Sequence, residues 1–384
     1  MAKLIYFVNK KRWVALLCLS GNLVACGFSV KYPDVAPHIA GKSDFNAESL
    51  CTVASDADRY IHTHPDDTYA VHQAEDVAIR FGLAALEMGR VVSTLQFICE
   101  IENEDKLKGR DSRLKDAEFL RKNFDFYLWS PDKETAVKIA GKSNNQKKAD
   151  LLRAIPDDKL LLTKYYTKLL NGRAQRGGEF TQALYALPYD EHALSEAQIQ
   201  ERKTSLTRFK YTRSDIINGA LRDKKLAEPL IWLTEAALHD VLLQGTGVID
   251  DSKTLRYFNV HKNNGIAYDY SLGKNEQERY WYFAEVDGIL GYGKKIEEKI
   301  HLIPGVSLAG DVEQLGLGKV FLIQYPVDGV IRKRIAVLAD EGGAFKNNVF
   351  QLDLLVDSYY GWDDYYAANK HMPDYAEVWL MLKK

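Results

Sequence analysis

The chain has 384 residues, which exceeds one typical domain and predicts two domains or one domain with a large insertion. Hydrophobic residues make up 46% and charged residues 27%, and these ordinary values exclude a chain that is disordered or membrane-embedded along most of its length. Because 51 Lys and Arg are balanced by 53 Asp and Glu, the net charge of -2 gives no overall basic excess of the kind that phosphate backbones require, and no nucleic-acid partner is expected.

The first residues have the layout of an export signal. Lys10, Lys11 and Arg12 precede the apolar stretch 13–25, as in a secretory signal peptide. Polar residues interrupt this stretch, which is shorter than the roughly 20 apolar residues that a membrane-spanning helix needs. We therefore expect residues 1–25 to be a signal peptide and not a permanent anchor.

The apolar stretch ends in a candidate lipidation site. Residues 23–26, Leu-Val-Ala-Cys, resemble the lipobox of bacterial lipoproteins, in which the cysteine is lipidated and becomes the mature N-terminus. A buried Cys26 after an ordinary signal peptide is the alternative. The next residue is Gly27 and not an aspartate, which in the lipoprotein pattern favours the outer membrane. The sequence predicts an outer-membrane lipoprotein, anchored in the inner leaflet through Cys26 and facing the periplasm.

Two further cysteines would then face an oxidising compartment. Cys18 lies inside the predicted signal peptide, so Cys51 and Cys99 are the only other thiols of the mature chain. A disulfide needs Cα atoms within bonding range, which spacing along the chain does not reveal. A disulfide and two separate buried thiols therefore both stay open.

The N-terminal third predicts a tether followed by helices. Residues 30–45 contain prolines and little periodicity, which predicts that the tether, residues 26–45, has no fixed structure. Apolar residues recur at helical spacing from residue 67 to 102, and a second helix is predicted over residues 112–123. His62 and His64 have no third ligand of recognisable spacing and are expected on a loop, so we predict no metal and no other cofactor.

After Pro156 the pattern becomes β-rich. Short apolar and aromatic runs alternate with Gly, Asn and Asp, as is typical of strands and turns. One helix is predicted over residues 213–223, and another around residues 232–243. The predicted strands are residues 160–166, 179–187, 255–260, 279–285, 319–325, 331–339, 349–356 and 377–382.

Residues 335–356 are the most informative stretch, with a strand, a Gly-rich turn and a second strand. In the second strand, strict alternation places Phe350, Leu352 and Leu354 on one face and Gln351 and Asp353 on the other. A carboxylate in the middle of a strand faces solvent, a partner or a cleft. Solvent is the commoner case, because one face of such a sheet is often open.

These residues also carry a family resemblance. Asp340-Glu341-Gly-Gly-Ala-Phe-Lys346, followed by Phe-Gln-Leu-Asp353, resembles the C-terminal motif of the membrane-bound lytic murein transglycosylase A (MltA) family. Residues 162–167 resemble the Thr-Gly-Tyr-Tyr segment of that family. Further matches follow in family order and extend the resemblance over residues 112–384: segments 178–188, 212–223, 244–249, 263–268, 272–274, 303–305 and 378–380.

The resemblance implies a peptidoglycan lytic transglycosylase, a lyase that cuts glycan strands between N-acetylmuramic acid (MurNAc) and N-acetylglucosamine (GlcNAc). Asp353 matches the catalytic acid of the family, and Asp340 matches its second catalytic aspartate. One carboxyl group can serve both as acid and as base in this chemistry, because the muramyl 6-hydroxyl attacks its own anomeric carbon. The substrate-binding residues implied are Tyr165, Tyr166, Gln244, Gly245, Thr246, Gly247, Asn264, Gly265, Tyr268 and Lys346.

The implied fold is mainly β with a helical N-terminal region. It is a double-psi β-barrel built from discontinuous segments, with a second β domain inserted. The expected boundaries are residues 46–171 for the helical region and first part of the barrel, 172–275 for the insertion and 276–384 for the rest of the barrel.

The chain also departs from the family. Asn347 and Asn348 lengthen the connection to Asp353 by about two residues and put its register in doubt. Residues 297–299, Glu-Glu-Lys, stand where the family has a further aspartate, and Lys164 stands where it usually has glycine. These departures motivate an alternative function, a catalytically impaired lipoprotein that binds peptidoglycan.

Overall fold

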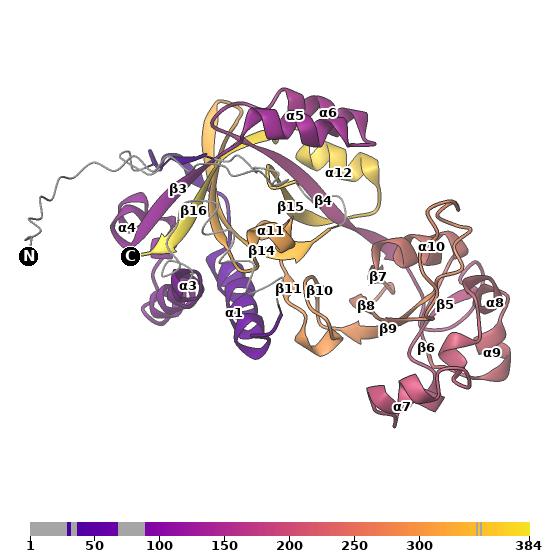
Figure 1. Ribbon diagram of the computed structural model, residues 1–384. Helices are drawn as coiled ribbons and strands as arrows, with labels where there is room; N and C mark the ends of the chain where they lie inside the picture. The colour runs from indigo at the N-terminus through magenta and orange to yellow at the C-terminus, as the bar shows by residue number, and fades with distance from the viewer. Residues whose placement is uncertain (1–28, 32–36, 68–88, 343–344, 346–347) are drawn as a thin grey trace, which may run out of the picture.

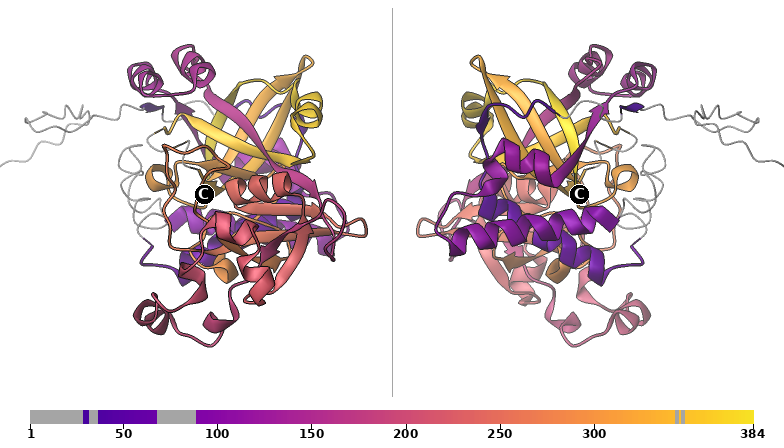
Figure 2. Two further views of the ribbon diagram at one scale, coloured as in Figure 1. Left: turned by 90° about the vertical axis from the view of Figure 1, so that its right-hand side faces the viewer. Right: turned by 90° about the vertical axis from the view of Figure 1, so that its left-hand side faces the viewer.

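The structure is a computed structural model that describes residues 29–31, 37–67, 89–342, 345 and 348–384 (Figure 1). The predicted signal peptide, Cys26 and Lys346 therefore lie outside the described residues. Two lobes are visible, one formed by long strands and flanking helices and the other by residues from the middle of the chain (Figures 1 and 2).

Six strands of the first lobe close into a barrel. Their order is β16 (Tyr375–Lys383), β13 (Val320–Val327), β14 (Val330–Glu341), β12 (Ser307–Gly310), β15 (Gln351–Tyr359) and β4 (Leu160–Asn171). Pairing of Tyr375 with Leu161 joins β16 to β4 and closes the ring. β12 runs parallel to β14, and β15 runs parallel to β4. The predicted mainly β fold is therefore correct, and the barrel combines strands that are far apart in sequence.

The barrel is held by one large apolar core. Leu308, Leu338, Leu352 and Leu354 are each no more than 1% exposed and lie in that core. Burial of side chains of this size stabilises the fold by roughly 1.5–3 kcal/mol each. β3 (Phe124–Ser130) extends the sheet beyond β16, β1 (Ser29–Lys31) pairs with β3, and β2 (Lys42–Ser43) pairs with β14.

Helices pack on two sides of the barrel. α1 (Ala47–Thr63) and α3 (Gly89–Leu107) pack together below the strands in Figure 1, with α4 (Ala117–Asn123) beside them. α5 (Lys133–Gly141), α6 (Gln146–Arg153) and α12 (Trp362–Asn369) lie on the opposite side, near β15 and β4. Among the described residues, no helix is long and apolar enough to cross a membrane.

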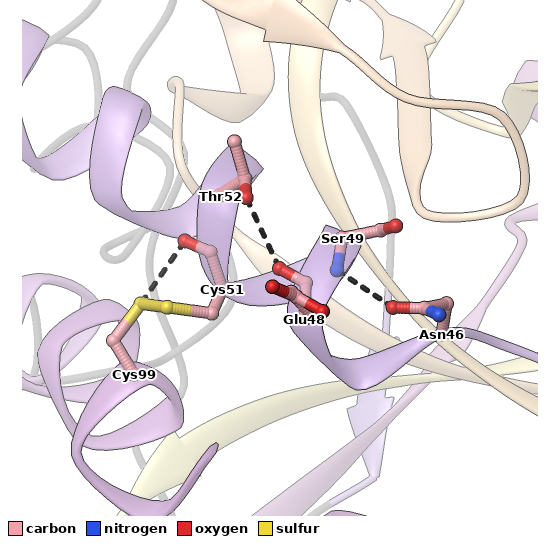
Figure 3. The surroundings of a disulfide bond; sticks show 6 residues. All are labelled: Asn46, Glu48, Ser49, Cys51, Thr52 and Cys99. Carbon is pink, nitrogen blue, oxygen red and sulfur yellow. Dashed lines mark hydrogen bonds between the residues drawn. A yellow bond between two sulfur atoms is a disulfide. The ribbon is translucent and has the colours of Figure 1, made fainter. Parts of the chain in front are cut away.

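Cys51 of α1 and Cys99 of α3 form a disulfide, with Cα atoms 4.8 Å apart (Figure 3). This pairing decides between the two alternatives that the sequence left open. α1 begins at a side-chain cap, in which Asn46 Oδ1 accepts a hydrogen bond from the Ser49 N–H at 2.8 Å.

The second lobe has its own core. β4 continues into it and pairs with β7 (Thr246–Asp250), which is followed by β8 (Leu255–Asn263) and β9 (Trp281–Val286). β5 (Gln182–Tyr185) pairs with β6 (Pro229–Leu233). The buried apolar residues of this lobe fall between Leu170 and Phe283. Its helices are α7 (Glu196–Glu201), α8 (Arg213–Ile217), α9 (Ala220–Lys224) and α10 (Glu235–Gln244).

Each of the eight predicted strands overlaps an observed strand, and the helix predicted over residues 213–223 is present as α8 and α9. The helix predicted around residues 232–243 begins later, because Trp232 belongs to β6 and Thr234 caps α10. Helix α1 was not predicted, and the helix predicted from residue 67 is described only from Gly89, as α3.

Two predictions for the N-terminal third are wrong. The described end of the expected tether is ordered, because β2 pairs with β14 and Asp44 Oδ2 accepts a hydrogen bond from Arg334 at 2.6 Å. His62 lies in the last turn of α1 and not on a loop, whereas His64 follows the helix as its C-terminal cap. His64 stacks on Tyr60 and contacts Glu298 at 2.9 Å.

Candidate active site

Asp353 lies in the middle of β15. It pairs with Ala309 of β12 on one side and with Thr163 of β4 on the other. Its neighbours Leu352 and Leu354 point into the barrel core, so Asp353 points outward, as the alternation predicts. On this outward face Asp353 is half-buried and lines a cavity. The strand therefore presents Asp353 to a cleft and not to a fully open surface.

The cavity has a volume of about 550 Å³ and lies between the barrel, α6 and α12. Its wall combines aromatic rings, amides and lysines. The lining residues are Asn145, Lys147, Lys148, Leu151, Leu161, Thr163, Lys164, Phe345, Gln351, Asp353, Trp362, Tyr365, Tyr366, Asn369, Lys370, Met372 and Asp374.

The cavity changes the protonation of Asp353. Burial raises its pKa to about 6, while the Thr163 hydroxyl and the charges of Lys164 and Lys148 act in the opposite direction. Its Oδ1 atom is buried and has no hydrogen-bond partner among the described residues. A buried oxygen without a partner is costly, and a ligand that donates a proton or hydrogen bond would satisfy it.

Asp340 ends β14 on the other side of β12. It pairs with the same residue, Ala309, so the two aspartates lie on strands either side of β12 and at the same level. Oδ2 of Asp340 accepts a hydrogen bond from the Tyr165 hydroxyl at 3.1 Å, and Oδ1 accepts one from the Glu341 N–H at 2.9 Å. Burial raises the pKa of Asp340 to about 7 despite these bonds.

Tyr165 connects the two aspartates. Burial raises the pKa of its hydroxyl well above the usual value, and the charges of Asp340 and Asp353 add to that rise. Among the predicted substrate-binding residues that the structure describes, Tyr165 thus lies close enough to both acids to be influenced by their charges. Of the two extra residues before β15, Asn348 is buried and its Nδ2 donates to Gln351 Oε1 at 2.9 Å.

Lys299, from the segment 297–299 that was expected to depart from the family pattern, lies near Asp340. The charge of Lys299 acts to lower the pKa of Asp340, and its Nζ donates to Asn259 Oδ1 at 2.7 Å. Glu298 faces His64 and Lys295. The group from this segment that lies near Asp340 is therefore positively charged.

Other predicted substrate-binding residues lie around the start of β7. Gln244 Oε1 accepts a hydrogen bond from the Lys168 N–H at 3.1 Å, and Thr246 Oγ1 accepts one from Asn259 Nδ2 at 3.1 Å. Gly245 ends α10 with a φ of +79°, a conformation that favours glycine, and Gly247 is buried. Tyr166 stacks on Tyr365, with ring centroids 4.7 Å apart.

The remaining predicted residues lie in the second lobe, away from the Asp353 cavity. Asn264 is buried, its Nδ2 donates to two backbone carbonyls and its Oδ1 accepts from the Tyr280 N–H, so its amide organises the loop. Gly265 has a φ of +79°, and a Cβ there would lie 2.8 Å from Phe209. Tyr268 packs beneath Arg279 and does not line the cavity.

Several cavity residues were not predicted as site residues: Thr163, Lys148, Lys164, Trp362 and Tyr365. The α6 segment is short and polar, so its sequence shows no periodicity from which a cavity wall could be predicted. The aromatic residues of segment 359–366, in contrast, could have indicated a ligand-binding surface. No cluster of three or more His, Cys, Asp or Glu residues able to hold a metal occurs in the part of the chain that the structure describes.

Part of the chain is similar to known proteins. Residues 161–279 match the sequence pattern of the MltA specific insert domain. The chain is 26% identical over 230 residues to the membrane-bound lytic murein transglycosylase A of Escherichia coli K12, which covers 50% of this chain. The aligned part spans 58% of that relative's length.

Solved structures show the same fold. The membrane-bound lytic murein transglycosylase from Agrobacterium tumefaciens superposes with a TM-score of 0.51 at 15% identity, covering 88% of this chain and 92% of that one. MltA from Neisseria gonorrhoeae gives 0.50 at 14% identity, covering 87% and 88%. The fold is thus that of the murein transglycosylases with a barrel and a second lobe. Over residues 161–279 the chain is thus similar to the insert domain of the MltA family, and half of it is similar to an MltA protein.

Proposed function

We propose that this chain is a peptidoglycan lytic transglycosylase that cleaves the β-1,4 bond between MurNAc and GlcNAc and leaves 1,6-anhydro-MurNAc ends. The observation that carries the proposal is Asp353, whose buried Oδ1 has no partner among the described residues and whose pKa is raised to about 6 in an open-sided cavity. The names of the E. coli and A. tumefaciens relatives support it.

In the proposed reaction Asp353 acts twice. Its protonated carboxyl donates a proton to the glycosidic oxygen as the bond from that oxygen to C1 of MurNAc breaks. The resulting carboxylate then accepts the proton of the muramyl 6-hydroxyl, whose oxygen attacks C1 and closes the anhydro ring. No water is consumed. A pKa of about 6 keeps both forms of Asp353 populated near neutral pH, as an acid that becomes a base requires.

Asp340 is proposed to assist and not to transfer the first proton. Both of its carboxylate oxygens already accept hydrogen bonds, from Tyr165 and from the Glu341 N–H. Such a group can hold the Tyr165 hydroxyl in place and contribute negative charge where the sugar becomes positively charged.

Glycan contacts are proposed for the other family-matched residues near the lobe junction, Tyr166, Gln244, Gly245, Thr246 and Gly247. Asn264, Gly265, Tyr268 and Lys346 complete the proposed set. The engaged amide of Asn264 favours a role in shaping its loop.

We further propose that the barrel is of the double-psi type and that residues 172–275 are the inserted domain. Parallel pairing of β12 with β14 and of β15 with β4 supports the first point. The separate core between Leu170 and Phe283 and the insert-domain match over residues 161–279 support the second.

Product analysis tests the proposed activity. Purified sacculi are digested with the full chain, and the released muropeptides are measured by mass spectrometry. We expect anhydro-muramic ends, one water lighter than the reducing ends that a hydrolase leaves. Reducing ends would refute the transglycosylase mechanism. Binding to sacculi without any release would favour the alternative, an impaired peptidoglycan-binding protein, for which the positive charge of Lys299 beside Asp340 is the motivating observation.

The proposed location is the periplasmic face of the outer membrane, through a lipid on Cys26. The basic segment and the lipobox-like residues 23–26 support it. Cys26→Ala should leave the chain unlipidated, with a changed mass and loss from the membrane fraction. Unchanged mass and fractionation would contradict a lipoprotein.

A further inference from the structure

An exposed aromatic surface adjoins the Asp353 cavity. Trp362 and Tyr366 are 62% and 55% exposed, lie one turn apart on α12, and both line the cavity. Their ring centroids are 6.2 Å apart, and their planes differ by 21°. Large exposed aromatic side chains that gather beside a cavity are a mark of ligand binding.

This surface is connected to the acid through further rings. Trp362 contacts Tyr365 at 5.2 Å between centroids, and Tyr365 stacks on Tyr166. The Tyr365 hydroxyl donates to the Lys164 carbonyl at 3.0 Å, which fixes the ring. After burial, the charge of Asp353 is the largest cause that raises the pKa of Tyr365, so this ring lies near the acid.

The opposite wall is basic. Lys147 and Lys148 of α6 line the same cavity, as do Lys164 and Lys370. Only Asp353 and Asp374 supply negative charge among the lining residues. Four lysines against two aspartates give the cavity a positive excess, although the chain as a whole carries a net charge of -2.

We propose that α12 and α6 form a subsite for a sugar that carries a carboxylate, placed next to Asp353. Trp362 and Tyr366 stack on the apolar face of the pyranose, and Lys147 and Lys148 pair with the carboxylate. The inference rests on the proposed glycan cleavage and deepens it, because such a subsite distinguishes muramic acid, with its lactyl group or peptide stem, from neutral GlcNAc.

Binding measurements on the full chain test the aromatic wall. The Asp353→Asn background prevents cleavage, and two probes of equal length are titrated calorimetrically, a neutral chitooligosaccharide and a peptidoglycan fragment with free muramyl carboxylates. Trp362→Ala should weaken binding of both probes by about 10-fold, as loss of one stacked ring and its contact area predicts. Trp362→Phe should restore most of that loss. Tyr189→Ala, a 52% exposed ring in the second lobe, is the matched control and should bind as the parent does.

Salt dependence tests the basic wall. The double variant Lys147→Gln, Lys148→Gln should weaken only the carboxylate-bearing probe, by about 10-fold, and should flatten its salt dependence. The control double variant Lys138→Gln, Lys142→Gln changes two exposed lysines at the end of α5. It should alter neither the binding of the carboxylate-bearing probe nor its salt dependence. Equal weakening of both probes by the α6 variant would overturn the selection for a carboxylate.

The outcomes separate this inference from the proposed function. If the native chain cleaves sacculi and the parent binds both probes, but the α12 and α6 variants bind as the parent does, the subsite is refuted and the function stands. If the native chain releases no fragments and neither probe binds the parent, the function fails and the subsite fails with it.

Discussion

The end of β14 and the middle of β15 hold two aspartates at the same level of the barrel, one on each side of Ala309. Burial raises the pKa of both, to about 7 for Asp340 and about 6 for Asp353. Their hydrogen bonding differs. Both oxygens of Asp340 accept hydrogen bonds from the protein, whereas Oδ1 of Asp353 has no partner among the described residues.

A raised carboxyl pKa alone therefore does not identify the general acid, because both aspartates have one. The pKa of Asp340 is the closer of the two to neutral pH, but each of its oxygens already accepts a hydrogen bond, one from Tyr165 and one from a backbone N–H. Asp353 is the carboxyl with a buried oxygen that accepts no hydrogen bond from the described residues, and it lines a cavity large enough to hold a ligand. Variants of the two aspartates and their neighbours test this assignment.

The largest effect is expected for Asp353→Asn, which keeps the shape and removes the transferable proton. The initial rate of muropeptide release from sacculi should fall by about 10² to 10⁴, the usual worth of general acid–base catalysis. Asp357→Asn, an exposed position on the same strand, is the control and should keep the native rate. Full activity of Asp353→Asn would show that Asp353 is not the general acid.

A smaller effect is expected for Asp340→Asn, because its role is to position and to tune. The rate should fall by about 10-fold, the order of one or two lost charge-assisted hydrogen bonds. Tyr165→Phe removes only the donor of the bond to Asp340 and should cost less. A loss for Asp340→Asn that equals or exceeds that of Asp353→Asn would show that the two carboxyls act as one unit, or that Asp340 is the acid.

The pH profile should respond to Lys164. Its charge lowers the pKa of Asp353, so Lys164→Gln should raise that pKa and move the alkaline limb of the rate profile upward, by about 0.5–1 pH unit. Glutamine can still donate to the carbonyls of Met372 and Pro373 that Lys164 now binds. If the alkaline limb stays unchanged or moves to lower pH, that limb does not report the titration of Asp353.

The smallest effect concerns stability. Because the folded pKa of each aspartate lies above the ordinary value of 3.8, the folded chain binds more protons than the unfolded chain between about pH 4 and pH 6 or 7. Stability therefore falls as pH rises through that window. Asp353→Asn should raise the melting temperature at pH 8 by roughly 2–5 °C and change it little at pH 4. A lower melting temperature at pH 8 would contradict a strained, desolvated carboxyl.

Several parts of the molecule follow from sequence pattern because their causes are local. Alternation along residues 349–356 predicted the outward direction of Asp353, and Thr212 and Asp215 form the capping box that begins α8. The β-rich pattern after residue 156 predicted the strands, because each has apolar residues at strand spacing.

Other parts depend on contacts between distant segments. The covered environment of Asp353 needs α6 and α12, which lie about 200 residues apart in sequence, on the two sides of one cavity. Nothing in the motif around Asp353 predicts that Lys148 and Lys164 approach it, or that β12 sets Asp340 opposite the same alanine.

The sequence by itself thus predicted the strands, and it carries the expectations for the export signal, the family resemblance and the two aspartates, since these depend on the order and type of neighbouring residues. The tertiary structure alone decided which carboxyl has an oxygen without a partner in the described part of the chain, how far each pKa rises and whether Cys51 meets Cys99. The physical reason is that desolvation, hydrogen-bond partners and bonding distance are properties of packing between remote segments, and no local pattern encodes them.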